Sequence, residues 1–330
     1  MQTRLLGRNG PSVSALGLGC MGFSGGYGPV DDRESIATVH AALDAGVNYL
    51  DTGDFYGAGQ NEMLLREALR DKRAQAFIAV KFGALRGPDG TWHGSDNRPA
   101  AVKNFLAYSL TRLGTDYIDL YQPARVDPAV PIEDTIGAIA DMVQAGYVRH
   151  IGLSEAGADT IRRAHKVHRI AALQIEYSLM SRGVEQTILP VLRELGIALV
   201  AYGVLSRGLI ADHALAGSPG GEIRARMPRF MGENLTRNRA LVAALQAIAR
   251  QKGCTTAELA IAWVASRGSA VIPLIGAKRP AQLASAIAAL EVALSLDDFA
   301  RIEAAMPADA VAGTRYGAPL MAHLDSEHAS

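Results

Sequence analysis

Three side chains at the ends of two apolar runs could together deliver a proton. Asp51 ends the run VNYLD, Tyr56 follows it within LDTGDFYG, and Lys81 ends the run FIAVK. A carboxylate holds a buried ammonium charged, and an ammonium beside a phenol lowers the phenol's pKa from its reference near 10. We therefore expect Tyr56 to act as a general acid toward a carbonyl oxygen while a hydride reaches the carbon. Taken singly, each residue also has an ordinary structural explanation, as a cap, a packing residue or a solvated cation.

These side chains must be positioned by a repeated unit in which a short apolar run precedes a segment with helical periodicity. The unit occurs eight times. Nearly continuous apolar runs are typical of parallel strands covered on both faces. The predicted strands are residues 15–19, 47–51, 77–81, 117–122, 148–154, 171–177, 197–202 and 271–275.

The segments between these runs predict helices, several of which carry their own stop signals. The predicted helices are residues 32–45, 61–70, 98–113, 132–145, 158–168, 183–195, 237–252 and 280–290. A glycine follows five of them, where a left-handed C-cap is needed. These are Gly46, Gly114, Gly146, Gly196 and Gly253. An extra helix should begin near Thr255, which forms a capping box with Glu258.

Eight βα units without a change in composition predict one closed TIM (β/α)8 barrel, a single α/β domain over residues 1–330. The opening segment RLLGRNGPSVSAL predicts a β-hairpin at the barrel floor, and the extra helix precedes strand eight. The segment 203–236 is long and rich in Gly, Pro and Arg. Long loops of this kind are usually functional or mobile.

Composition argues against several classes of partner. Lys plus Arg and Asp plus Glu number 33 each, so no bulk charge attracts nucleic acid or an anionic membrane. Cys20 and Cys254 lie outside any metal-binding spacing, and no long apolar stretch marks a leader or a membrane span. We expect a cytoplasmic protein without a metal, whose partner is a small molecule; the sequence does not predict its oligomeric state.

A GxGxxG motif at residues 17–22, GLGCMG, formally matches a dinucleotide-binding βα turn. That motif requires a helix immediately after the third glycine and an acidic residue about 20 residues later. Here FSGGYGPVDD delays the helix to about Asp32, and Asp51 lies too far on. We interpret these glycines as a close-packed loop at the barrel mouth. A two-domain Rossmann dehydrogenase is the alternative enzyme class.

Nine segments distributed along the chain resemble the aldo-keto reductase superfamily, in its order and spacing, from about Leu5 to Leu296. They are GVNYLDTGDFYG, VKFG, SLTRLGTDYIDLYQ, HIGLSEA, LQIEYSLMSR, AYGVLSRGLI, MPRFMGENL, KGCTTAELAIAWV and IPLIGAKRPAQL. The resemblance implies a reductase of aldehydes or ketones that uses NADP(H), with Asp51, Tyr56 and Lys81 as catalytic residues. It implies that the cofactor lies extended across the barrel mouth.

The same resemblance implies a set of cofactor contacts. Ser154, Glu155 and Gln174 match positions near the nicotinamide carboxamide, with Glu155 standing where many relatives have Asn, and Tyr202 matches the aromatic that stacks on the ring. Lys278 and Arg279 are adjacent cations at the start of a predicted helix, and such a pair suits the 2′-phosphate of NADP. The remaining expected contacts are Met21, Gly203, Val204, Leu205, Arg207, Gly208, Ile275, Gly276, Ala277, Lys278, Arg279 and Gln282. Ala286 stands where many relatives place an Asn.

One residue departs from the family pattern at the expected active site. Relatives usually read DLYQxHR, in which the His binds the substrate carbonyl, whereas this chain reads DLYQPAR with Ala124. Three interpretations are open. The chain is a working reductase with another donor, of which His93 is a candidate; or Ala124 is a deliberate substitution or makes room for a bulkier substrate; or the chain is a weakly active or inactive NADP(H)-binding subunit that senses redox state.

Substrate identity depends on loops, which carry several candidate contacts. These are Phe23, Tyr27, Phe55, Trp92, Phe230 and the tail after Ala310. The tail is polar and rich in small residues, so we expect it to be flexible and assign it no role. A metallohydrolase barrel is disfavoured because His and carboxylate pairs are missing from the predicted strand ends.

Overall fold

Eight parallel strands form a closed barrel in this computed structural model, which describes residues 1–211 and 222–328. Around the barrel the strands follow the order β10-β11-β12-β3-β4-β5-β8-β9. Their bounds are Gly17–Gly19 (β3), Tyr49–Gly53 (β4), Phe77–Phe82 (β5), Ile118–Pro123 (β8), Val148–Ser154 (β9), Ile170–Glu176 (β10), Ala198–Tyr202 (β11) and Val271–Gly276 (β12). All eight predicted strands are confirmed, and so is the TIM-barrel fold.

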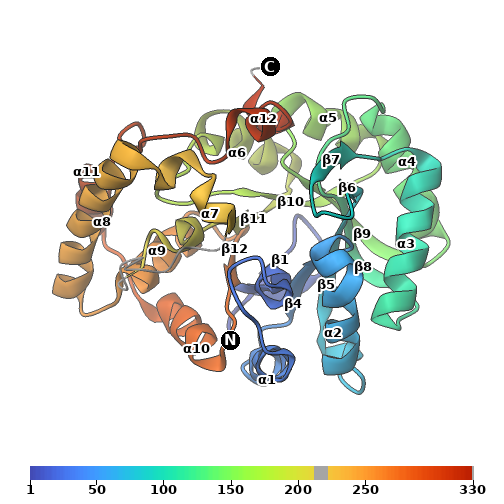
Figure 1. Ribbon diagram of the computed structural model, residues 1–330, viewed down its shortest axis with the longest axis horizontal. Helices are drawn as coiled ribbons and strands as arrows, with labels where there is room; N and C mark the ends of the chain where they lie inside the picture. The colour runs from blue at the N-terminus through green and yellow to red at the C-terminus, as the bar shows by residue number, and fades with distance from the viewer. Residues whose placement is uncertain (212–221, 329–330) are drawn as a thin grey trace.

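Helices surround the barrel as a ring (Figure 1). Their bounds are Asp32–Asp44 (α1), Gln60–Ala68 (α2), Pro99–Leu113 (α3), Ile132–Gln144 (α4), Ala158–Val167 (α5), Val184–Leu195 (α6), Glu222–Ala225 (α7), Gly232–Lys252 (α8), Thr256–Ala265 (α9), Pro280–Ala288 (α10), Leu296–Ala305 (α11) and Ala318–Met321 (α12). The five predicted glycine stops all have positive φ. Within the described residues, no helix is long and apolar enough to cross a membrane.

The predicted start of one helix needs correction, and three helices, α7, α11 and α12, were not predicted. Helix α8 begins at Gly232 rather than 237, because Met231 provides an extended N-cap position and the first turn carries Glu233. Helix α11 was not predicted, although Ser295 and Asp298 form a capping box at its start. The capping box predicted at Thr255 and Glu258 is present at the start of α9.

The apolar core has two layers. One layer fills the space between the barrel and the helices, and the other fills the barrel itself. Leu6 and Val13 belong to the inner layer, where they pack with Tyr49 and Phe77. They come from the hairpin of β1 (Thr3–Leu5) and β2 (Ser12–Ser14), as predicted for the barrel floor.

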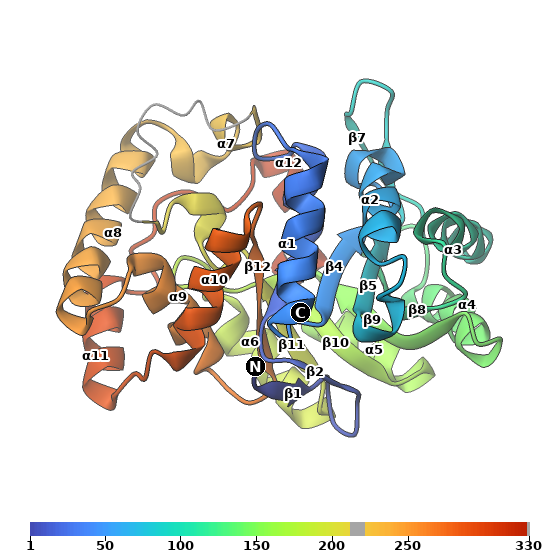
Figure 2. The ribbon, with the colours of Figure 1, turned by 90° about the horizontal axis from the view of Figure 1, so that it is seen from below.

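The opposite end of the barrel carries the functional loops (Figure 2). The β1–β2 hairpin lies at one end, and a second hairpin, β6 (Ala84–Arg86) with β7 (Trp92–Ser95), lies at the other together with α7 and α12. After β3 a 3-10 helix spans Cys20–Ser24 and α1 begins only at Asp32. The Rossmann alternative is therefore excluded by topology. Part of the predicted long loop, residues 212–221, lies outside the described residues.

Candidate active site

A buried ion pair lies at the carboxyl ends of two neighbouring strands. The Lys81 ammonium contacts the Asp51 carboxylate, and both side chains are almost fully buried. In the register of β4 and β5, Gly53 lies beside Lys81. Asp51 is two residues before Gly53, so the side chains of Asp51 and Lys81 reach the same mouth of the barrel. Across the barrel, Gln174 of β10 donates a 2.6 Å hydrogen bond to the other oxygen of Asp51. Burial lowers the pKa of Lys81, and Asp51 counteracts this by favouring the ammonium.

Tyr56 lies above this pair on a short 3-10 turn, Tyr56–Gly59. The Lys81 ammonium is 5.0 Å from the centre of the Tyr56 ring. Within the described residues the Tyr56 hydroxyl makes no hydrogen bond, so it is available to a ligand. The predicted lowering of its pKa is wrong: burial and the Asp51 charge raise the pKa of Tyr56 well above 10. Lys81 is already neutralised by Asp51, which explains why the ammonium does not dominate.

Position 124 offers no side-chain donor. Ala124 is 1% exposed, and its backbone N–H donates to the Phe82 carbonyl at 2.8 Å. His93, the expected substitute, is exposed on β7 and its ring nitrogen lies 2.9 Å from the Thr91 hydroxyl. His93 is thus engaged on the hairpin. The nearest chain neighbour with donors is Arg125, whose guanidinium donates to the Ala124 carbonyl at 2.6 Å.

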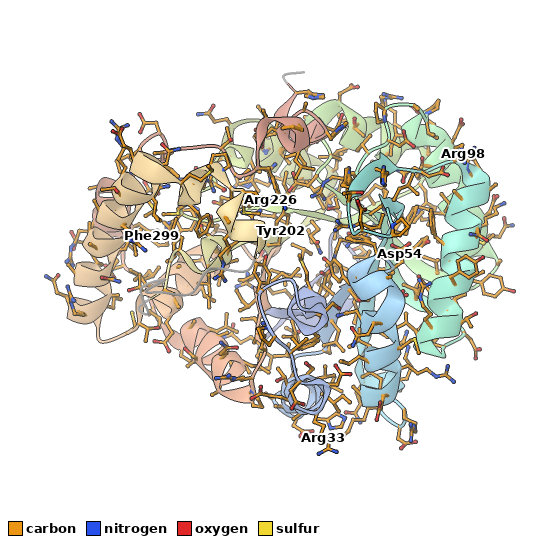
Figure 3. The ribbon with its side chains drawn as sticks, in the orientation of Figure 1. Arg33, Asp54, Arg98, Tyr202, Arg226 and Phe299 are labelled. Carbon is orange, nitrogen blue, oxygen red and sulfur yellow. The ribbon has the colours of Figure 1, made fainter. Side chains whose placement is uncertain are left out.

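The expected nicotinamide-binding residues converge on the same mouth from β9, β10 and β11. Ser154 is buried, and its hydroxyl has no hydrogen-bond partner among the described residues. A buried orphan hydroxyl usually signals a missing ligand or water. Gln174 lies at the same level as Ser154 in the β9–β10 register. Tyr202 is half-buried at the end of β11, and Figure 3 shows it toward the middle of the view.

Glu155 is the exception among these residues, because other protein groups already saturate its carboxylate. One oxygen accepts from the Tyr202 hydroxyl at 2.7 Å and from Arg315 at 2.8 Å. The other oxygen accepts from Arg315 at 2.5 Å and from the Ser326 hydroxyl at 2.8 Å. Arg315 overcomes the effect of burial and holds the pKa of Glu155 at about 2. The geometry therefore favours a structural role for Glu155 over direct contact with a carboxamide.

The segment after β11 forms a tight turn with several residues in the left-handed region. Ser206, Arg207 and Gly208 have φ values of 47, 57 and 91°. Arg207 is nevertheless fixed, because its guanidinium donates to Glu176 at 2.9 Å. The expected contacts Gly203, Val204 and Leu205 precede this turn, and Val204 is buried. This part of the long loop is thus ordered around a cation.

The carboxyl end of β12 carries the other expected cofactor contacts. Ile275 and Ala277 are buried, whereas Gly276 is exposed. The Lys278 ammonium donates to the carbonyls of Tyr27 and Gly28 at 2.9 and 3.1 Å, which ties β12 to the loop after β3.

Two residues beyond that end remain accessible. Arg279 is exposed and lies 3.4 Å from Glu34, and Gln282 accepts from the Lys278 backbone at 2.9 Å. Met21, in the loop after β3, is half-buried.

The C-terminal tail is anchored across the mouth, which differs from the expected flexibility. Arg315 is 6% exposed and pairs with Glu155, and Asp325 accepts from the Gly157 backbone N–H at 2.7 Å. The Tyr316 hydroxyl lies 3.0 Å from that of Tyr202, and Arg207 stacks over the Tyr316 ring at 4.7 Å. The tail therefore covers one side of the site.

The predicted substrate-contact residues divide into two groups. Phe23 is fully buried in the core and is not accessible to a substrate. Phe55 packs edge-on against Tyr56 at 4.8 Å, and the Trp92 ring lies 5.6 Å from the Arg86 guanidinium. Tyr27 lies near Arg224, and Phe230 packs partly against the core. Of these residues, Phe55 of the β4 loop is in direct contact with the proton donor Tyr56.

Sequence reasoning missed several charged residues of the site. Glu176 ends β10 and binds Arg207 and Arg229, a position that the strand-end rule could have found within LQIEY. Arg125 follows the strand end at which the family pattern has its histidine. Arg315 gave no signal, because its contact with Glu155 joins residues 160 positions apart.

The comparisons with known proteins agree on one protein family. The family model "Aldo/keto reductase family" matches residues 15–307. The chain is 42% identical over 316 residues to "Probable aldo-keto reductase 1" of Glycine max, covering 94% of this chain and 90% of that protein. Among solved structures it is similar to a glycerol dehydrogenase from Gluconobacter oxydans (27% identity, TM-score 0.83, covering 98% and 96% of the two chains). It is also similar to an aldo-keto reductase from Bacillus halodurans in its holo form (28% identity, TM-score 0.76, covering 93% and 97%).

Proposed function

Because the chain belongs to the aldo/keto reductase family and is thus a carbonyl oxidoreductase with a nicotinamide cofactor, we propose that it reduces aldehydes or ketones to alcohols with NADPH. The observation that carries this proposal is the Asp51–Lys81 pair beneath Tyr56, whose hydroxyl is free of other bonds within the described residues. A small-molecule carbonyl compound is the expected partner. The cytoplasmic location expected from the sequence stays a prediction.

Each member of this group has a defined role in proton delivery. When bound, NADPH supplies the hydride that reduces the carbonyl carbon. Tyr56 donates its proton to the carbonyl oxygen, and the raised pKa of Tyr56 keeps the phenol protonated until it does so. The Lys81 ammonium is the cation beside the Tyr56 ring, and Asp51, held by Gln174, fixes the ammonium in place.

The residues present fit a nicotinamide cofactor at this mouth. The orphan hydroxyl of Ser154 and the amide of Gln174 offer hydrogen bonds to a carboxamide, and Tyr202 offers an aromatic face. The exposed Arg279 is placed to meet a 2′-phosphate, and Arg207, paired with Glu176, orders the turn expected to lie along the pyrophosphate. These features support NADP(H) over NAD(H). Glu155 would act indirectly, by holding Tyr202.

Tyr56→Phe tests the proposal. Turnover of a broad aldehyde and ketone panel, followed by NADPH absorbance, should fall at least ~100-fold because the general acid is removed. NADPH affinity, measured by fluorescence titration, should stay within about twofold because the binding residues are untouched. Tyr108→Phe, which removes the hydroxyl of an exposed tyrosine on α3, is the matched control and should keep full activity. Full activity of Tyr56→Phe would remove Tyr56 as the acid.

Ala124 favours a second candidate function, that of an NADP(H)-binding subunit with little or no turnover. Losing one donor to the developing oxyanion costs on the order of 10²- to 10³-fold in turnover in other enzymes. The two functions are distinguished by the same panel. Tight NADPH binding with negligible reduction of every carbonyl compound would support the sensing subunit.

A further inference from the structure

The Arg125 guanidinium at the mouth pairs with none of the carboxylates whose side chains the structure describes. Four other cations of the site have carboxylate partners: Lys81 pairs with Asp51, Arg207 and Arg229 pair with Glu176, and Arg315 pairs with Glu155. Among the side chains that the structure describes, which do not include that of Glu222, Arg125 has no carboxylate oxygen within ion-pair distance. Within the described part of the chain, its guanidinium donates to the neutral Ala124 carbonyl alone. A half-buried unpaired charge is costly, which makes this arrangement informative.

The backbone around Arg125 is fixed next to the proton donor. It follows β8, whose Gln122 lies beside Lys81 in the register with β5. The Asn97 amide donates to the Arg125 carbonyl at 2.7 Å, and the Ala124 N–H donates to Phe82. The hydrogen bond to Ala124 folds the guanidinium back over the residue that lacks a side-chain donor.

The charge of Arg125 acts on both sides of the mouth. Burial and the Asp51 charge raise the pKa of Tyr56, and the Arg125 charge acts in the opposite direction. The Arg125 charge also contributes to lowering the pKa of Lys81. Burial lowers the pKa of Arg125 itself, but Tyr316, Tyr202 and Glu155 outweigh this and raise it. The guanidinium therefore stays charged between the proton donor and the tail.

We propose that Arg125 binds a carboxylate of the substrate, so that the preferred substrates are aldehydes or ketones that also carry a carboxylate. The planar guanidinium has five N–H donors, one of which is used by Ala124, and its fork matches a carboxylate in two parallel hydrogen bonds. This inference rests on the proposed reductase function and assigns its substrate class.

The test compares benzaldehyde with the three carboxybenzaldehyde isomers, using NADPH and the full chain. The wild type should prefer at least one carboxylated isomer in kcat/KM. Arg125→Met should lower kcat/KM for that isomer about 10- to 100-fold more than it lowers kcat/KM for benzaldehyde, with the additional loss mainly in KM, because only the carboxylated isomer loses a hydrogen bond to a charged group. Arg125→Lys should fall between the two. Arg33→Met is the control, because Arg33 is an exposed residue of α1, and this variant should match the wild type.

Titration calorimetry with benzoate supplies a readout independent of turnover. Benzoate should bind the wild type at least ~10-fold more tightly than Arg125→Met, with circular dichroism confirming that the variant is folded. Equal benzoate affinities, or equal losses for neutral and carboxylated aldehydes, would overturn the inference. If no aldehyde is reduced by the wild type while benzoate binding still depends on Arg125, the reductase function fails and the anion site stands.

Discussion

Among the individual residues of the site, Ala124 removes a donor without dismantling the proton-delivery group. Asp51, Lys81 and Tyr56 keep their geometry, because they are held by β4, β5 and Gln174 rather than by residue 124. The gap therefore affects the stabilisation of the developing oxyanion. Stabilisation of the oxyanion matters more because the pKa of Tyr56 is raised. A weaker acid transfers its proton to the carbonyl oxygen less readily.

We expect Ala124→His to raise kcat at least ~10-fold, because an imidazole donor would restore oxyanion stabilisation. Steady-state kinetics on benzaldehyde measures this change, and NADPH titration should show unchanged cofactor affinity. Ala124→Leu is the control for volume alone and should not raise kcat. A rate equal to or below the wild type for Ala124→His would mean that the pocket is built around alanine.

Cofactor choice is also expected to depend on a single exposed residue. Arg279→Ala should raise the Kd for NADPH about 10-fold and leave the Kd for NADH within about twofold, because the 2′-phosphate loses a charge-assisted hydrogen bond. Fluorescence titration with both cofactors measures the two constants. Arg98→Ala, which removes an exposed arginine on the other side of the barrel, should change neither. An equal rise in the Kd for NADPH and for NADH would show that Arg279 does not bind the 2′-phosphate.

Among the secondary-structure elements, the tail acts as part of the site wall because ion pairs attach it. Arg315 joins Glu155 at the end of β9, and Glu155 in turn positions Tyr202 at the end of β11. Gly157 holds Asp325, so the tail is fixed at two points. Any change at Glu155 is therefore expected to reach the nicotinamide side of the site through Tyr202.

The tail contact should depend on pH through Glu155. Its pKa is about 2 in the folded protein against an ordinary value of 4.5, so its stabilisation is complete above pH 4.5 and is lost as the pH falls toward 2. Glu155→Gln should cost roughly 2 kcal/mol of unfolding free energy at pH 7, because buried Arg315 loses its charge-assisted hydrogen bonds to Glu155 and keeps only Glu327 and the more distant Glu176. Urea unfolding at pH 7 and pH 3 measures this, and the two proteins should become more similar at pH 3.

The exposed pair of Arg162 and Glu194 provides the matched control. Glu194→Gln removes a salt bridge of similar geometry but high exposure, so it should change stability by less than about 1 kcal/mol at either pH. Limited proteolysis of the tail adds a local readout, with faster cleavage after residue 310 expected in Glu155→Gln alone. Identical stability of Glu155→Gln and the wild type at pH 7 would show that the tail contact is weak.

For the molecule as a whole, the eight strands of the closed barrel come from most of the length of the chain. Strand β3 pairs with both β12 and β4, so the first and last βα units are mutually dependent. We therefore predict one domain that unfolds in a single transition, with near- and far-ultraviolet circular dichroism coinciding. NADPH at 100 times its Kd should add about 2.7 kcal/mol and raise the midpoint. Two separate transitions, or no shift with NADPH, would contradict this.

Local patterns predicted the elements because their signals are local. Apolar runs marked all eight strands, positive-φ glycines ended five helices, and the capping box at Thr255 started α9. Ser295 carries the same kind of signal, so α11 was also predictable from the sequence. The start of α8 was missed because Met231 is not a usual capping residue.

The barrel and the family follow from the amino-acid sequence, which also puts Asp51, Tyr56 and Lys81 at strand ends where a closed barrel must bring them together. The pKa of Tyr56, the burial of Phe23 and the engagement of Glu155 by Arg315 emerge only from the folded chain. The strands and helices follow from periodicities of a few residues. Burial and charge pairing depend on contacts across the barrel, which no local pattern records.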